Sequence, residues 1–255
     1  MYLGAERPLF HERRETLSVH GKDGMGDSGI VCPRGEIAPG RAADFILEKV
    51  ARFPGEVEIV SLGPATNIAS AILLDRKIMK KVKRIWSMGT PGFGPGNATP
   101  VAEFNVYIDA EAYAIMLGAG IPVTVAGFDL CTMGTALGES EIEKLRRGNA
   151  MGVFLEKATR VLRAFNKTAR GAAVADLPDA VAMAAALWPG VVLKTVPCHA
   201  FCATKEEETY GQVIFYREDR VYEAMPDVSR LGRVEVVERI DEALFREKLL
   251  ALLTA

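Results

Sequence analysis

Residues 58–74 read EIVSLGPATNIASAILL. The first five residues form a short run rich in β-branched and apolar side chains, which is typical of a strand. The Gly-Pro pair that follows favours a turn, and either Thr66 or Asn67 can cap a helix over residues 68–74. A strand joined through a tight turn to an apolar helix predicts a β–α unit of the kind from which parallel sheets are built.

The same alternation of strand and helix recurs on both sides of this unit. Further strand-like runs occupy residues 84–88, residues 122–127 and the stretch that begins at Val191. Helical apolar spacing occurs over residues 42–53, 109–117, 151–165, 177–188 and 241–253. Strands that are apolar on both faces and interleaved with helices predict an α/β fold with a mostly parallel open sheet flanked by helices. Because no repeat or linker-like tract divides the sequence, we expect a single domain over residues 1–255.

The composition excludes several classes of protein. The chain has 255 residues, of which 49% are hydrophobic and 25% charged, so it is not a disordered, collagen-like or coiled-coil chain. Its 31 Lys and Arg against 33 Asp and Glu carry no basic excess, so we expect neither a nucleic-acid nor a membrane partner. The uncharged apolar run over residues 180–188 is too short to cross a bilayer.

The N-terminal residues do not read as a secretion signal, and four cysteines are scattered along the chain, so we expect a cytoplasmic protein with free thiols. Residues 198–202 read CHAFC, which resembles a fragment of a zinc knuckle. No second ligand pair accompanies them in the sequence, and the preceding run is strand-like. We therefore interpret Cys198 and Cys202 as buried thiols on a strand.

The polar segment richest in chemistry is GNATPVAEFN, residues 96–105. If the chain is extended here, Glu103 and Asn105 point to one side and Phe104 to the other. Together with Asn97 they would present one carboxylate and two carboxamides, a set that can bind a polyhydroxylated ligand such as a sugar. The alternative is a capped turn that leads into the next helix, and composition alone favours that turn.

Two other segments admit both a structural and a functional interpretation. Asp176 can cap a helix whose first turn contains Pro178, and the helix dipole then favours Asp179. The functional alternative is that Asp179 is a metal ligand or a base held at a helix start. Residues 20–26, HGKDGMG, form a Gly-rich loop without the features of a phosphate-binding loop, and His20 is by default a solvated side chain.

Taken together, these segments resemble the inosine/uridine-preferring nucleoside hydrolases. Residues 96–105 are similar to the family's most specific internal motif almost residue for residue. Further blocks occur in the family's order at LGPATN (62–67), SMG (87–89), GFD (127–129) and PDAVA (178–182), and HGKDGMG is similar to the family's active-site loop. The resemblance covers essentially the whole chain.

The resemblance implies a calcium-dependent enzyme that hydrolyses the N-glycosidic bond of purine or pyrimidine ribonucleosides to ribose and a free base, in nucleoside salvage. It implies Asp179 and the backbone carbonyl of Leu62 as ligands of Ca²⁺. Substrate contacts carried over in the same way are Asn97, Glu103 and Asn105 to the ribose hydroxyls, Met88 lining the sugar pocket, and His20 on the loop over the nucleoside. Relatives are usually homo-oligomers.

The sequence departs from the family at two places. Family members begin with a strand that ends in a cluster of the form Asp-x-Asp-x-x-x-Asp-Asp, which supplies most calcium carboxylates and the catalytic base, and no such cluster occurs in the 255 residues. Pro178 also stands where some members carry a histidine that protonates the leaving base. We therefore expect the N-terminal strand unit to be missing, the base to be outside this chain and the calcium site to be incomplete.

Three explanations of that missing unit stay open. The first, which we favour, is a misassigned start or a truncation, so that the working enzyme is longer. The second is a degenerate relative that binds ribosides without hydrolysing them. The third is a partner chain that supplies the aspartates. The base preference cannot be read from the sequence, because variable regions such as residues 134–171 supply those contacts.

Overall fold

The computed structural model describes residues 1–12, 19–30, 35–132, 134–205 and 207–255. Its strands are β1 (Glu58–Ser61), β2 (Arg84–Met88), β3 (Val123–Ala126), β4 (Val192–Cys202), β5 (Val213–Arg217) and β6 (Gly232–Ile240). Its α-helices are α1 (Ala42–Arg52), α2 (Thr66–Leu74), α3 (Arg76–Met79), α4 (Phe104–Ile108), α5 (Ala110–Leu117), α6 (Glu139–Arg146), α7 (Ala150–Ala158), α8 (Arg160–Arg170), α9 (Pro178–Leu187) and α10 (Glu242–Thr254). Two 3₁₀ turns, η1 (Phe128–Cys131) and η2 (Glu207–Thr209), complete them.

The six strands form one sheet in the order β1-β2-β3-β6-β4-β5. The first four are parallel, whereas β4 runs antiparallel to both β6 and β5. This mixed α/β architecture confirms the predicted mostly parallel sheet flanked by helices. In the parallel part Ser61 pairs with Ser87 and Ser87 with Val125, so the carboxyl ends of β1, β2 and β3 lie at the same edge.

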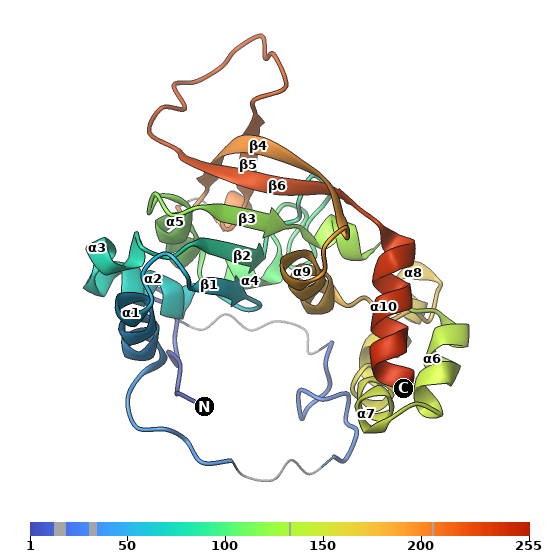
Figure 1. Cartoon of the computed structure of the whole chain (residues 1–255). Coiled ribbons are helices and arrows are strands. Elements are labelled where there is room, and N and C mark those ends of the chain that lie inside the picture. Colours follow the sequence, from blue (N-terminus) through green and yellow to red (C-terminus); the bar gives the residue numbers. More distant parts are fainter. Residues whose placement is uncertain (13–18, 31–34, 133, 206) are drawn as a thin grey trace.

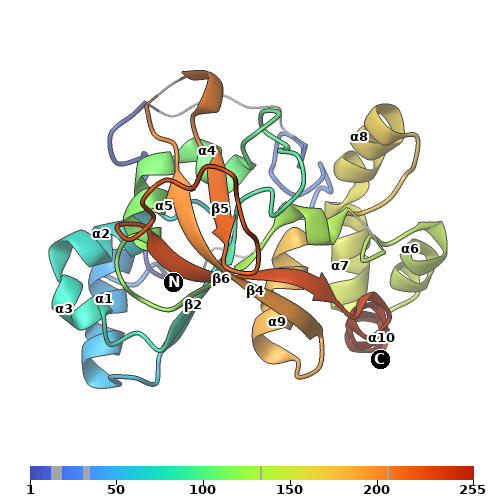
Figure 2. The ribbon, with the colours of Figure 1, turned by 90° about the horizontal axis from the view of Figure 1, so that it is seen from above.

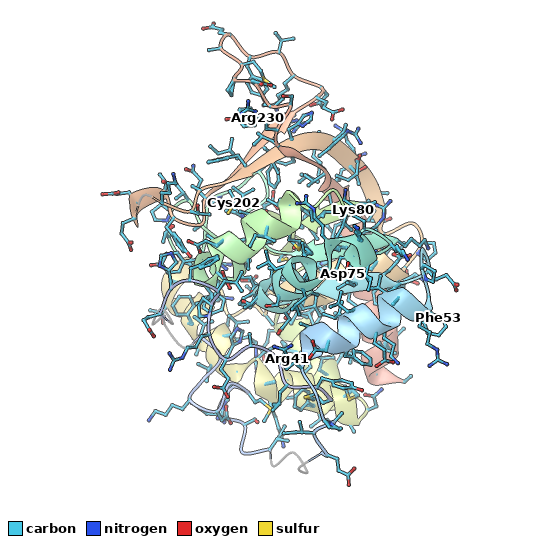
Figure 3. The ribbon with its side chains drawn as sticks, turned by 90° about the vertical axis from the view of Figure 1, so that its left-hand side faces the viewer. Arg41, Phe53, Asp75, Lys80, Cys202 and Arg230 are labelled. Atoms are coloured by element: carbon cyan, nitrogen blue, oxygen red, sulfur yellow. The ribbon has the colours of Figure 1, made fainter. Side chains whose placement is uncertain are left out.

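Helices cover the sheet in two groups (Figures 1 and 2). One apolar core joins α1, α2 and α5 to the sheet through side chains such as Ile72, Ile85 and Tyr113. A second core, which includes Met88 and Phe245, joins α9 and α10 to the carboxyl ends of the strands. Figure 3 shows the side of the first group, with α1 running between Arg41 and Phe53.

The predicted strands at residues 58–62, 84–88 and 122–127 are confirmed as β1, β2 and β3. The extended conformation considered for residues 102–107 is not observed, because residues 104–108 form α4, which Glu103 caps. The helix predicted over residues 151–165 is two helices, which meet at Thr159. At that point the Thr159 hydroxyl donates to the carbonyls of Leu155 and Glu156, so it competes with the regular helical hydrogen bonds.

Two predicted helix caps are also wrong. Thr66 and Asn67 lie inside or at the start of α2, and the N-cap position is Ala65. The N-cap of α9 is Leu177 rather than Asp176. Asp176 instead accepts hydrogen bonds from Asn166 and Arg170 of α8, so a tertiary contact replaces the local one.

Cys198 and Cys202 are buried thiols on β4, as predicted, whereas Cys32 lies outside the described residues. Burial raises the pKa of the Cys198 thiol to about 12. Within the described ranges, no helix combines the length and apolar character needed to span a membrane.

Candidate active site

Three parallel strands end next to one another at the edge of the sheet where α9 begins. Leu62 follows β1, Met88 ends β2 and Gly127 follows β3. Helix α9 packs against all three strands, so its first turn, with Asp179, lies at that edge. Ligands of open parallel sheets bind at this position, because the loops that leave the strands there face the same space.

Glu103 is the most deeply buried charged side chain among the predicted site residues, with 2% of its surface exposed. It occupies the N-cap of α4, where its carboxylate accepts hydrogen bonds from the backbone N–H groups of Asn105, at 3.0 Å, and Val106, at 3.3 Å. An acidic side chain at a helix N-terminus satisfies free N–H groups and favours the helix dipole. The cap therefore fixes the direction of the carboxylate.

Burial raises the pKa of Glu103 to about 7. The backbone N–H donors of Asn105, Val106 and Thr90 oppose the shift, and the negative charge of Asp179 adds to it. Glu103 and Asp179 are thus close enough to interact, although they lie 76 residues apart in the sequence. The negative charge of Asp179 beside the buried Glu103 gives this part of the site a negative potential, which favours a cation or a developing positive charge.

Asn105 is the second residue of α4, and only 8% of its surface is exposed. Its amide Nδ2 lies 3.3 Å from the Met88 carbonyl oxygen and 3.2 Å from the Met88 Sδ. The fold therefore brings Asn105 and Met88, two of the residues assigned to the sugar from the sequence, into contact. Phe104 lies between the two polar residues and is exposed, whereas Glu103 and Asn105 are buried. Glu103 is the N-cap of α4 and Asn105 lies in its first turn, so the helix start, and not an extended strand, places both side chains on the inner side.

Asn97 sits at the surface rather than in the buried part of the site. Its Oδ1 accepts a hydrogen bond from the backbone N–H of Phe104 at 2.9 Å, which ties the loop to the start of α4. The preceding Gly96 packs so tightly that a Cβ there would lie 2.1 Å from the Thr99 carbonyl oxygen. The turn that presents Asn97 therefore requires glycine at this position.

Asp179 and His20 form the open side of the site. Both are exposed, and within the described residues no hydrogen bond or ion pair reaches the Asp179 carboxylate. Partial desolvation raises the pKa of Asp179, and the charge of His20 opposes that shift. The fold therefore brings His20 into electrostatic range of Asp179.

The donor set falls short of a calcium site in the part of the chain that the structure describes. No group of three or more His, Cys, Asp or Glu side chains there is arranged to hold a metal ion. Asp179 and the Leu62 carbonyl would supply two oxygens, whereas Ca²⁺ takes about six to eight. The described residues therefore do not fit a complete Ca²⁺ site by themselves.

Two features beside the site were not predicted from the sequence. Thr90 is buried at a φ of +72°, a conformation that strains a β-branched residue, and its backbone faces the Glu103 carboxylate. Asp129 accepts hydrogen bonds from the backbone N–H groups of Phe93 and Leu130, and burial raises its pKa. The GFD block around Asp129 was visible in the sequence, but no sequence signal marks the strain at Thr90.

A cavity of about 720 Å³ opens beside the loop of residues 93–96. Phe93, Phe128, Asp129 and Arg170 are among the residues that line it. None of the seven predicted site residues is among its lining residues, so it adjoins the candidate site and does not contain it.

Comparison with known proteins identifies relatives along most of the chain. The family model described as inosine-uridine preferring nucleoside hydrolase matches residues 1–247. A uridine nucleosidase of Arabidopsis thaliana is 41% identical over 134 residues, which is 52% of this chain and 39% of that protein. A pyrimidine-specific ribonucleoside hydrolase of Salmonella paratyphi C is 33% identical over 215 residues, 83% of this chain and 68% of that protein.

Solved structures agree with these sequence matches. A plant nucleoside hydrolase superposes with a TM-score of 0.90 and 28% identity, covering 99% of this chain and 79% of that one. A purine-preferring ribonucleoside hydrolase from Gardnerella vaginalis has a TM-score of 0.84 and 25% identity, covering 98% of this chain and 78% of that one. The chain spans about two fifths of the length of the plant uridine nucleosidases that it matches.

Proposed function

The chain belongs to the inosine-uridine preferring nucleoside hydrolase family, and we propose on that basis that it hydrolyses the N-glycosidic bond of ribonucleosides to ribose and a free base. The observation that carries the proposal is the buried Glu103, fixed by the α4 N-terminus and electrostatically coupled to Asp179. Of the residues assigned to the sugar by sequence, Asn105 contacts both Glu103, through its backbone N–H, and Met88, through its side-chain amide.

Ribose recognition follows from the donor and acceptor types at the site. The Glu103 carboxylate accepts hydrogen bonds from sugar hydroxyls, whereas the amides of Asn105 and Asn97 offer both donors and acceptors. Because Glu103 and Asn105 are buried and held by backbone groups, they are organised before the sugar binds. Polar groups that are already ordered lose little entropy when the sugar binds, so more of the binding free energy is available to orient the reacting carbon.

Bond cleavage transfers charge in a direction that this site favours. As the C1′–N bond breaks, the electron pair leaves with the base and the ribosyl ring becomes positively charged. The negative potential around Glu103 and Asp179 stabilises that positive charge. Water then adds its hydroxyl group to C1′, and the remaining proton of the water ends on the nitrogen of the departing base, so that the products are ribose and the neutral base. Among the described residues we assign no group that removes the proton from water.

We propose Ca²⁺ as the metal of this activity, with Asp179 and the Leu62 carbonyl among its ligands, as the family resemblance implies. Because two ligands do not complete a calcium shell, we derive no catalytic step through the ion. The cytoplasmic location, the homo-oligomeric state and the role in nucleoside salvage belong to the same proposal.

A second candidate function is riboside binding without hydrolysis. The observation that favours it is the incomplete donor set around Asp179 within the described residues, since a site without metal or base would still grip the sugar. Both functions predict sugar contacts from Glu103 and Asn105. They differ in turnover, because only the hydrolase releases ribose.

The deciding experiment incubates the chain with inosine or uridine, with and without Ca²⁺, and measures both nucleoside binding and released reducing sugar. Release that disappears in the Glu103→Gln variant supports the hydrolase, whereas binding without release supports the second function. Glu247→Gln, on an exposed position of α10, is the matched control and should behave as wild type. Absence of both binding and release would contradict both functions.

A further inference from the structure

The loop over residues 19–30 that carries His20 is a compact, internally bonded unit. The backbone N–H of Gly26 donates to the His20 carbonyl at 2.7 Å, which closes the loop on itself. Asp23 accepts from the N–H groups of Met25 and Asp27, and Asp27 accepts from that of Lys22. Because these bonds connect both ends of the turn, anything that holds Gly26 also holds His20.

Gly26 is the point at which this loop rests on the rest of the protein. It is buried, has a φ of +72°, and a Cβ there would lie 2.4 Å from the Ala158 carbonyl oxygen and 2.6 Å from that of Lys157. These two carbonyls belong to the last turn of α7. Only glycine permits such an approach, so the loop backbone lies directly against the end of this helix.

Arg160, the first residue of α8, holds the loop from the adjoining helix. Its Nη2 donates to the carbonyl oxygens of both Gly26 and Asp27. A guanidinium that donates to two successive carbonyls fixes their position more strongly than a neutral donor does. The loop is therefore fixed at the junction of α7 and α8.

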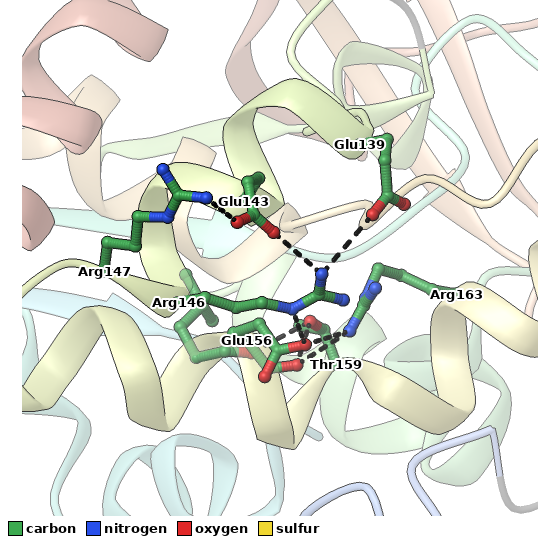
Figure 4. Close-up of polar contacts among 8 residues, drawn as sticks. Glu139, Glu143, Arg146, Arg147, Glu156, Thr159 and Arg163 are labelled. Carbon is green, nitrogen blue, oxygen red and sulfur yellow. Dashed lines mark hydrogen bonds and ion pairs between the residues drawn. The ribbon is translucent and has the colours of Figure 1, made fainter.

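The junction itself is held by an ion-pair network (Figure 4). Glu156 of α7 accepts from Arg163 of α8 at 2.9 Å and from Arg146 of α6 at 3.2 Å. Arg146 also pairs with Glu143 at 2.9 Å. Because Arg163 is almost fully buried, this network locks the relative position of the two helices that hold the loop.

We propose that Arg160 is a positioning residue that, through Gly26 and Asp27, holds His20 opposite Asp179 at the nucleoside site. The proposal rests on the proposed function in assigning that site to a nucleoside. Arg160 is exposed and lies outside the segments that carry the family motifs, so its role follows only from the contact between the loop and α8. The chemistry of His20 depends on its place, and Arg160 determines that place.

Histidine nuclear magnetic resonance tests this positioning without any enzymatic activity. The chain has three histidines, so the His20 ring signal can be assigned with the His20→Gln variant alone. We expect the Asp179→Asn substitution to shift the His20 signal in the wild-type background and to leave it unchanged in an Arg160→Ala background. An equal response in both backgrounds, or no response in the wild type, would overturn the proposal.

Hydrogen exchange provides the second measurement. In Arg160→Ala we expect the amide of Gly26, which is bonded to the His20 carbonyl, to exchange about tenfold faster, the change that loss of one charge-assisted hydrogen bond produces. Arg160→Lys keeps a charged donor and should restore part of the protection. Lys167→Ala removes a cation from an exposed position of the same helix and serves as the matched control. Unchanged exchange in Arg160→Ala would contradict the proposal.

Nucleoside binding separates this proposal from the proposed function. If Arg160 acts through His20, then Arg160→Ala weakens nucleoside binding about tenfold in the wild type and has no effect in the His20→Ala background. Equal losses in the two backgrounds would assign Arg160 a merely structural role. If the wild type binds no nucleoside, the proposed function fails, and the resonance experiment still decides whether Arg160 positions His20.

Discussion

The two sides of the candidate site are built in opposite ways. On the sugar side, Glu103 and Asn105 are buried and their polar groups are bonded to backbone and side-chain groups of the sheet edge and α4. On the opposite side, Asp179 and His20 are exposed, and within the described residues the hydrogen bond of His20 is the one that its backbone carbonyl accepts from Gly26 of the same loop. The comparison indicates that the side proposed to bind the sugar is organised in advance by buried contacts, whereas the side proposed to hold the metal depends on exposed groups.

The largest effect should come from the charge on the sugar side. Because the folded pKa of Glu103 is about 7 against 4.5 for the free side chain, the folded state binds the proton more tightly than the unfolded state. The contribution of protonated Glu103 to the free energy of unfolding is therefore complete below pH 4.5 and is lost as the pH rises to about 7. We expect Glu103→Gln to remove this pH dependence, which amounts to roughly 3 kcal/mol of unfolding free energy.

Urea unfolding of the wild type and Glu103→Gln at pH 5 and pH 8, without added Ca²⁺, measures this difference. Glu247→Gln should retain the wild-type pH dependence, since its carboxylate is exposed. An identical pH dependence in the wild type and Glu103→Gln would contradict the prediction, because it would show that ionisation of Glu103 does not lower the free energy of unfolding.

A somewhat smaller effect is expected at Asn105. The Asn105→Ala substitution leaves a sugar hydroxyl without its partner in a buried site, so nucleoside affinity should fall by about 2 kcal/mol, roughly thirtyfold. Calorimetric titration with inosine or uridine measures the dissociation constant. Asn149→Ala removes the N-cap of α7 and should reduce stability without changing affinity. Equal affinities of Asn105→Ala and wild type would remove Asn105 from the sugar site.

The open side should respond weakly to Ca²⁺. With few ligands from this chain, we expect a dissociation constant near the millimolar range, so that about 10 mM Ca²⁺ stabilises the fold by about 1 kcal/mol. Asp179→Asn should abolish this stabilisation, and so should low pH, since the raised pKa of Asp179 lets it take up a proton earlier on acidification. Thermal unfolding with Ca²⁺ and with Mg²⁺ measures the effect. The same stabilisation in Asp179→Asn would place the ion elsewhere.

The smallest effect is expected at Asn97, which belongs to the sugar side in sequence but is exposed. Asn97→Ala loses one hydrogen bond to the Phe104 backbone and should cost about 1 kcal/mol of stability. Asn97→Asp keeps that acceptor and loses the amide donor, so it should retain stability while nucleoside affinity falls about fivefold. Denaturant unfolding and nucleoside titration of the two variants separate the roles, and full affinity in both would restrict Asn97 to a structural role.

The sequence predicted most of the parallel half of the fold. Short apolar runs bounded by glycine mark β2 and β3 at nearly the observed residues, because a strand buried on both faces leaves a local signature. The strands β5 and β6 were not predicted, and neither was the antiparallel pairing of β4 with them. Residues 232–240 alternate apolar and charged side chains, and which strand they pair with depends on contacts far away in the sequence.

The residue spacing placed Glu103 and Asn105 on the same side of an extended segment. The two side chains do lie on the same side, but the segment is the start of a helix. An extended segment and an N-capped helix both place residues 103 and 105 on the inner side, but only the helix supplies the backbone N–H groups that the carboxylate accepts. The cap was recognisable in principle, because Glu103 precedes an apolar turn. The sequence left an extended segment and a capped turn open, and composition favoured the turn, because alternation over a few residues does not separate the two structures.

By itself the sequence determined the order of the strand–helix units and the segments that reach the sheet edge, because these depend on local side-chain patterns and on motifs that resemble one family. Only the tertiary structure decided which of the polar groups are buried. Glu103 and Asp179 have the same chemistry, but one lies under the sheet edge and the other faces solvent. Their protonation, their coupling and the contact of Arg160 with the His20 loop follow from neighbours distant in sequence, since the electrostatic free energy of a charge depends on what surrounds it in space.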